Sequence, residues 1–145
     1  MTTIPRMLLV AAACLLLAGA AAAANELAEA DRLFAQGGLE NYQRSIALYT
    51  QAALQDPGSF EAHWKTARAH REYAHAVKKE NLADWKKTCA EHGKIGMQYA
   101  QKAIDLQPDK PDGHYYYGVN VGIYSDGVSI VTALAEGLKD KTQGS

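Results

Sequence analysis

Two stretches of the chain, Ala52–Ala67 (AALQDPGSFEAHWKTA) and Ala103–Gly118 (AIDLQPDKPDGHYYYG), share one pattern 51 positions apart. Each has a small residue late in a helix, a proline, a histidine followed by an aromatic residue, and a second small residue. The proline ends the first helix, and the small residues let two helices cross at about 8–10 Å. Each stretch therefore predicts an antiparallel helix hairpin, whose structural positions are Ala52, Pro57, Ala67, Ala103, Pro108 and Gly118.

The flanking sequence extends this pattern into about six helices. The pair Gly37–Gly38 and the run Asp56–Gly58 are helix-ending signals, and Asn41, Ser59 and Asn81 are suited to N-caps. Helical periodicity predicts helices over about 26–36, 41–55, 59–77, 81–107, 111–125 and 128–141. The chain over 25–145 is thus expected to be an all-α domain of stacked antiparallel pairs at about 26–55, 59–107 and 111–141.

Composition and charge narrow the class of protein. The 145 residues are 48% hydrophobic, which is enough for one packed domain, and 15 basic side chains balance 16 acidic ones. A formal charge of −1 lacks the basic excess that nucleic-acid binding needs. We therefore expect no nucleic-acid partner.

The first 24 residues have the layout of a secretory signal peptide. A short segment with one base, Arg6, precedes an apolar run that passes into small residues, with cleavage expected near Ala22–Ala24. Two alternatives are an uncleaved signal anchor and a lipoprotein attached through Cys14. Export is the preferred interpretation, with no membrane span in the mature form.

Export leaves one cysteine in the mature chain, Cys89. A single thiol cannot form an internal disulfide, so Cys89 is either buried or joins two chains. It lies in an apolar stripe with Trp85, His92 and Gly96, which favours burial.

The spacing of the two stretches resembles the tetratricopeptide repeat (TPR) family. The proline lies ten positions before the second small residue in both, as in that family, although the 51-residue period exceeds the usual value of about 34. The strings WKTARA at 64–69, GKIG at 93–96 and YGVNVG at 117–122 are similar to a long-repeat TPR group. This group includes the accessory protein of bacterial tripartite ATP-independent periplasmic (TRAP) transporters and the regulator-of-microtubule-dynamics proteins.

The resemblance implies a short right-handed solenoid whose concave groove binds a protein or peptide. The export signal favours the TRAP accessory protein, which implies a periplasmic location and a solute-binding protein as one partner. Positions next to the expected crossings would line the groove: Trp64, Arg68, Arg71, Tyr115, Val119 and Asn120. The two arginines could hold a carboxylate or an acidic peptide.

Simpler interpretations of the same residues stay open. The two aromatic side chains could pack between helices, the arginines could form a solvated edge, and Asn120 could be a buried hydrogen-bonding link. A different function, carriage of a hydrophobic or anionic small molecule in the same groove, is the alternative to partner binding.

No pattern in the sequence indicates catalysis, a metal or a cofactor. The spacing of His63, His70 and His75 does not suit three ligands of one ion, and His70–His75 is one residue too long for the zinc-protease HExxH pattern. Neither a Gly-x-Ser-x-Gly elbow nor a glycine-rich phosphate loop is present. We expect a non-enzymatic protein with histidines in packing or surface positions.

Overall fold

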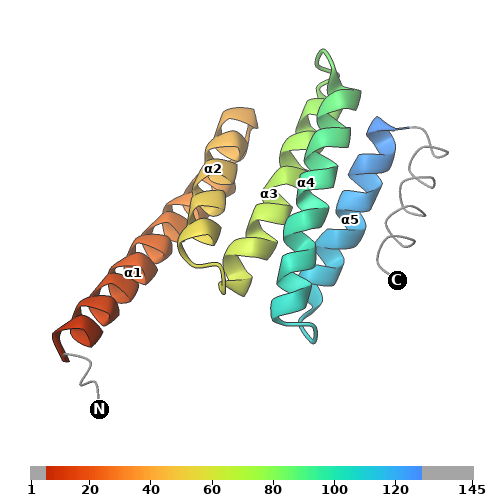
Figure 1. Ribbon diagram of the computed structural model, residues 1–145. Helices are drawn as coiled ribbons and strands as arrows, with labels where there is room; N and C mark the ends of the chain where they lie inside the picture. The colour runs from red at the N-terminus through yellow and green to blue at the C-terminus, as the bar shows by residue number, and fades with distance from the viewer. Residues whose placement is uncertain (1–5, 129–145) are drawn as a thin grey trace.

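The computed structural model describes residues 6–128, and within this range every regular element is a helix. The helices are α1 (Arg6–Gln36), α2 (Leu39–Gln55), α3 (Phe60–Lys79), α4 (Trp85–Leu106) and α5 (Pro111–Gly127). Neighbours along the chain run antiparallel, and α3 packs against α2, α4 and α5 (Figure 1). The all-α prediction is confirmed. The expected helix over 128–141 lies outside the described residues.

The first pair of helices turns at two glycines, as the sequence predicted. Gly37 and Gly38 have φ of 69° and 88°, the left-handed region that glycine adopts without steric cost. Helix α2 begins at Leu39, so Asn41 is not its N-cap; Gly38 is. Because Asn41 already lies inside the helix, its side chain instead donates back to the Gly37 carbonyl at 2.9 Å.

Helix α1 begins well before the predicted position near residue 26. It runs without a break through the segment that resembles a signal peptide. Ala23, 3% exposed, packs in a cluster with Ala52, Ala53 and Ala62. Among residues 6–128, no helix combines the length and apolar character that crossing a bilayer requires.

The connection from α3 to α4 differs from the prediction. Asn81 was expected to cap α4, but α4 begins at Trp85 and its N-cap is Asp84. Asn81 and Asp84 have φ of 50° and 58°. Short polar side chains tolerate this left-handed conformation, so the chain reverses over 80–84 before the new helix starts.

The two predicted hairpins share one turn geometry. After α2, the Asp56 N–H donates to Ala52 at 2.9 Å, and the Ser59 N–H then donates to Asp56 at 3.0 Å. After α4, Gln107 donates to Ala103 at 3.0 Å, and Lys110 donates to Gln107 at 3.1 Å. The sequence repeat is therefore also a structural repeat.

The helices after these turns start in different ways. The Ser59 side chain caps α3 by accepting from the Ala62 N–H at 3.2 Å, as predicted. Helix α5 has no side-chain cap and begins at Pro111, whose fixed φ suits the first helical position. The two hairpins thus have the same turn geometry, although their second helices begin with different capping residues.

The expected crossing positions divide into two groups. Ala52, Ala67 and Ala103 are fully buried, as predicted, whereas Gly118 is exposed and no described residue lies within 4 Å of a Cβ built on it. Gly118 thus has no close crossing with the helices that the structure describes, and the second helix of its expected pair, over 128–141, lies outside the described residues. At about 100° per residue, Gly118 lies about 160° around α5 from Asn120, which faces α3 and α4.

Candidate functional site

A row of aromatic and cationic side chains joins α1, α3 and α5. The Trp64 ring stacks on Tyr116, with centroids 5.6 Å apart and planes 10° apart. The Arg68 guanidinium carbon lies 4.0 Å from the Phe34 ring centroid and 5.0 Å from that of Trp64. We call Phe34, Trp64, Arg68, Tyr115 and Tyr116 the aromatic face.

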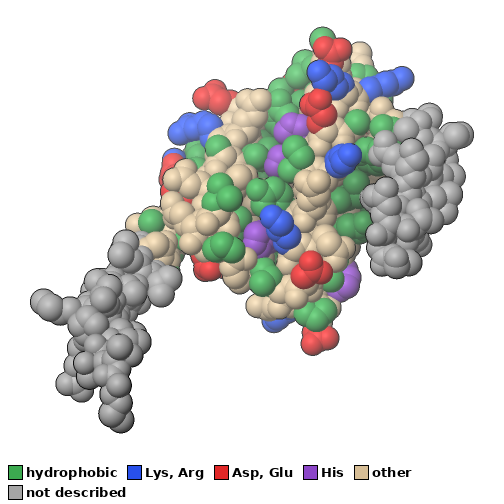
Figure 2. Space-filling view, in the orientation of Figure 1, with side chains coloured by type: hydrophobic (Ala, Val, Ile, Leu, Met, Phe, Trp, Pro, Cys, Tyr) green, Lys and Arg blue, Asp and Glu red, His purple; other side chains and the backbone are tan. Residues whose placement is uncertain are grey.

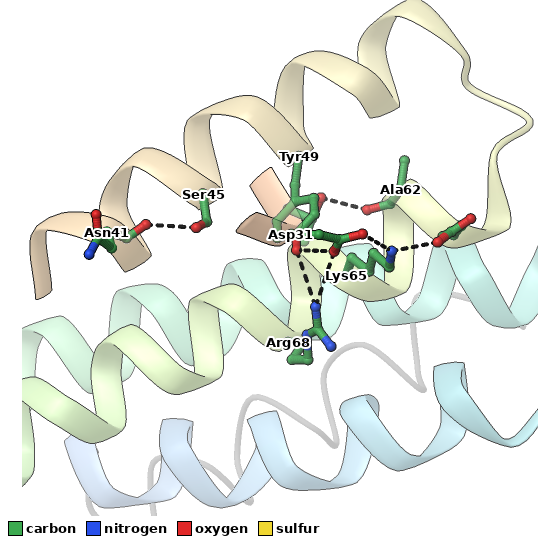
Figure 3. A network of polar contacts seen from close by, with 9 residues as sticks. Asp31, Asn41, Ser45, Tyr49, Ala62, Lys65 and Arg68 are labelled. Carbon is green, nitrogen blue, oxygen red and sulfur yellow. Dashed lines mark hydrogen bonds and ion pairs between the residues drawn. The ribbon is translucent and has the colours of Figure 1, made fainter. Parts of the chain in front are cut away.

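Arg68 is held in place by hydrogen-bonding partners. One nitrogen, Nη2, donates to the Tyr49 hydroxyl at 3.1 Å and lies 3.6 Å from the Asp31 carboxylate (Figure 3). The Tyr49 hydroxyl donates to the same carboxylate at 2.5 Å. Burial and the hydrogen bond to Asp31 raise the pKa of Tyr49 well above its ordinary value. The phenol therefore stays protonated and is available to donate.

Lys65 completes this polar network on the same helix. Its side chain is 9% exposed, and its ammonium group contacts Asp31 at 2.6 Å (Figure 3) and Glu61 at 2.5 Å. A charge this buried requires a partner. Asp31 of α1 thus contacts two cations of α3, and it ties the aromatic face to the first pair of helices.

The predicted pair of arginines is not combined in one site. Arg71 contacts Glu72 at 2.6 Å, while Arg68 turns toward Asp31 and Tyr49. Each guanidinium already has an acidic neighbour. A free carboxylate would have to compete with these partners.

The residues expected on α5 have three different environments. Tyr115 is 62% exposed and places its edge on the ring of Tyr116, whose centroid is 5.0 Å away. Val119 is half-buried. Asn120 is fully buried, and its amide donates to the carbonyls of Ala67 at 3.1 Å and Tyr116 at 2.7 Å. Of the two interpretations of Asn120, the geometry fits the link between helices.

Sequence reasoning missed five residues of this site, one of which, Lys65, lies on the same helix as Trp64. Phe34, Asp31 and Tyr49 lie on the first pair of helices, far along the chain from Trp64. Tyr116 was hidden within the run of three tyrosines at 115–117, where residue type alone does not tell which ring faces α3. A helical projection anchored on buried Asn120 would have selected Tyr116, one turn earlier on the same face.

Two histidines occupy equivalent turn positions, as the repeat suggested. A ring nitrogen of His63 bonds the Pro57 carbonyl at 2.9 Å, and His114 bonds Pro108 in the same way at 2.8 Å. Across residues 6–128 there is no group of three or more His, Cys, Asp or Glu side chains that could hold a metal ion.

Cys89 is fully buried, as its apolar stripe predicted. It packs with Ala74 and Ile123, and its thiol donates to the Ala74 carbonyl at 3.7 Å. Burial raises the pKa of Cys89, and the nearby carboxylate of Asp126 acts in the same direction. The thiol is therefore poorly suited to act as a nucleophile.

Comparison with known proteins gives one match. Residues 26–142 match the family model described as "Regulator of microtubule dynamics protein 1-3". No curated protein and no solved structure matches the chain. Of the two long-repeat groups that the sequence resembles, the match supports the microtubule-dynamics family and gives no support to the transporter accessory protein.

Proposed function

We propose a function from the premise that this chain belongs to the regulator of microtubule dynamics protein 1-3 family. In this proposal, the protein is a non-enzymatic helical-repeat module that binds a partner protein or peptide against the aromatic face. Helical-repeat domains commonly use surfaces shared between successive repeats for binding.

The single observation that supports this proposal is the continuous stack from Phe34 through Arg68 and Trp64 to Tyr116, with Tyr115 left 62% exposed at its end. Tryptophan, tyrosine and arginine are the residue types that most often dominate binding energies at protein interfaces. Here they are fixed by packing, so a partner would not need to order them.

The chemistry of the face also indicates the kind of partner. The cations of Lys65, Arg68 and Arg71 are paired with carboxylates of the chain itself. The exposed ring of Tyr115 remains available for contact. We therefore propose a peptide that contributes apolar or aromatic side chains, with ionic contacts in a minor role.

Replacement of the exposed ring tests this proposal. Tyr115→Ala removes the ring but leaves Trp64 and the polar network untouched, so the fold should persist while partner binding falls by about tenfold or more. The matched control is Leu54→Ala, because Leu54 is 72% exposed on α2 and lies outside the aromatic face.

Binding is measured by quantitative affinity enrichment from extract and by co-sedimentation with polymerised tubulin, since the family is named for microtubule dynamics. A protein retained by wild type and by the Leu54 variant, and lost from the Tyr115 variant, supports the proposal. Equal retention of the partner by wild type and both variants contradicts the proposal. Circular dichroism of each variant shows that the helices are intact.

The carrier alternative makes a different prediction. The structure has a hollow of about 410 Å³ lined by Gln98, Tyr99, Gln101 and Lys102, which lies on α4 and not on the aromatic face. A carrier should release a bound small molecule in native mass spectrometry of the purified protein. Such a molecule would favour carriage over partner binding.

We also propose that the chain is exported, with cleavage near Ala22–Ala24. The sequence pattern of residues 1–24 supports this. Cleavage after Ala23 or Ala24 would remove Ala23, which packs with Ala52, Ala53 and Ala62. The intact mass of the exported protein decides the matter, because a chain that keeps its first two dozen residues would support a signal anchor instead.

A further inference from the structure

Two histidines from different helices face each other at the contact between α3 and α4. The Nδ1 atoms of His70 and His92 are 2.9 Å apart, and their ring centroids are 4.9 Å apart. One ring must carry a proton on Nδ1 and donate it to the lone pair of the other. If both rings are protonated, two N–H groups and two positive charges oppose each other, and the bond is lost.

The surroundings of this pair are mostly rings. Tyr99 of α4 stacks on His70 with centroids 6.2 Å apart, and the Tyr73 ring of α3 lies 4.7 Å from His92. From α2, the Gln43 amide donates to the Tyr73 hydroxyl at 2.8 Å. Figure 2 shows histidine side chains among hydrophobic ones on the face where α3 lies between α2 and α4.

The charged and titratable groups near the pair do little to stabilise a second positive charge. Glu91 of α4 favours the protonated form of His92 electrostatically. The Tyr99 ring also lies near His63, with ring centroids 5.9 Å apart, and near Lys102, whose ammonium group is 5.4 Å from the Tyr99 centroid. His70 itself is 5% exposed.

Burial disfavours the charged form of both rings. It lowers the pKa of His70 to about 3, and the neighbouring His92 acts in the same direction. Burial also lowers the pKa of His92, while Glu91 opposes this. In an opened state both rings would titrate near the ordinary value of about 6.5.

The direction of the pH effect follows from these shifts. A group whose pKa is lowered in the closed state binds more protons once the contact opens. The closed state therefore has its full stability above about pH 6.5 and loses it as the pH falls, by about tenfold in the opening equilibrium per pH unit for each histidine.

We propose that the His70–His92 pair is an acid-sensitive lock: in neutral solution it holds α3 to α4, and in mildly acidic solution the contact between the two helices weakens and opens more often. The lock acts on the centre of the fold, because α5 packs against both of these helices. It does not depend on whether the aromatic face binds a partner.

Amide hydrogen exchange of the full chain at pH 7.5 and 5.0, corrected for the intrinsic exchange rate, tests the lock. His92→Asn places an amide where the Nδ1 atom was, so it keeps a hydrogen-bonding group that does not titrate. His75→Asn is the matched control, since His75 is an exposed histidine of α3.

Between these pH values each histidine that takes up a proton only on opening should raise the opening equilibrium of α3 and α4 by up to about 30-fold, so His70 and His92 together should give a rise well above 30-fold in wild type. In His92→Asn only His70 contributes and the rise should fall to about 30-fold, whereas His75→Asn should behave as wild type. An equal rise in wild type and His92→Asn would overturn the proposal.

A second measurement does not require the variant to fold. Nitrogen-15 spectra of the wild-type imidazoles should show one protonated Nδ1 in the pair, with neither ring titrating between pH 7.5 and 5.0 while the chain stays closed. A ring of the pair that titrates near its ordinary pKa in the closed protein would overturn the lock.

Discussion

Helix α3 is held by different forces on its two sides. Toward α1 and α2, its long side chains Lys65 and Arg68 reach the Asp31 carboxylate. Toward α5, a carbonyl of α3 at Ala67 accepts from the Asn120 amide, and Asn120 lies against Gly96 of α4. The first side joins flexible side chains through charge, whereas the second depends on close approach of the helices themselves.

This difference determines how each side should respond to substitution. A flexible ion pair that is partly exposed can rearrange and recruit water. A backbone contact has no such freedom, because helix axes shift only as whole bodies. The closely packed helices α3, α4 and α5 should therefore lose more stability on substitution than the charged contact between α3 and the first two helices.

A methyl group at Gly93 should have the largest effect. A Cβ built there lies 2.5 Å from the backbone nitrogen of Tyr124 on α5, so α4 and α5 must separate. We expect Gly93→Ala to lower the free energy of unfolding by about 3 kcal/mol. Chemical denaturation measures the change.

The same substitution at Gly118 is the control. No described residue lies within 4 Å of a Cβ there, so the better helix propensity of alanine should raise stability by about 0.5–1 kcal/mol. Equal losses at Gly93 and Gly118 would show that close packing of α4 on α5 is not the cause.

Removal of the Asp31 carboxylate should have an intermediate effect. Asp31→Ala leaves buried Lys65 with Glu61 as its acidic partner and removes the ion pair of Arg68. Because the Asp31 side chain is 41% exposed, we expect a loss of about 1–2 kcal/mol, below the range for fully buried pairs.

The exposed pair between Arg32 and Glu29, which flank Asp31 on α1, gives the comparison. Arg32→Ala should leave the denaturation midpoint unchanged, and high salt should reduce the Asp31 effect only slightly. If Asp31→Ala and Arg32→Ala have the same effect, the ion pairs of Asp31 contribute no more to the free energy of unfolding than a solvated surface pair.

The smallest effect concerns the two repeated turns. His63 is buried and its ring also lies near Tyr99, whereas His114 is exposed, although each bonds a proline carbonyl. We expect His63→Ala to cost about 1–1.5 kcal/mol and His114→Ala about 0.5 kcal/mol, by thermal and chemical unfolding. A larger loss at His114 would contradict the role of burial.

The parts of the fold that depend on local chemistry were predictable from the sequence. Gly37, Ser59 and Pro111 mark helix ends through their own backbone preferences or side-chain bonds, and each occupies the expected place. Asn81 failed as a cap because the path of the α3–α4 connection depends on how the two helices pack.

The candidate site was less predictable because its partners are distant in sequence. Lys65 and Asp31 are 34 positions apart, and nothing in the spacing of either helix marks them as partners. Gly118 illustrates a related difficulty: a small residue indicates a possible close contact, but not which helix it meets, and no described helix approaches it closely. The tertiary fold decides both which charged side chains meet and which face of each helix is turned toward its neighbours.

The reach of Asp31 across to α3 has a consequence for synthesis. A ribosome releases α1 and α2 before Lys65 and Arg68 exist outside the exit tunnel, so the carboxylate and the Tyr49 phenol of the nascent hairpin are at first without their cationic partners. The first hairpin can begin to form early, but it reaches its final side-chain arrangement only after translation has passed α3.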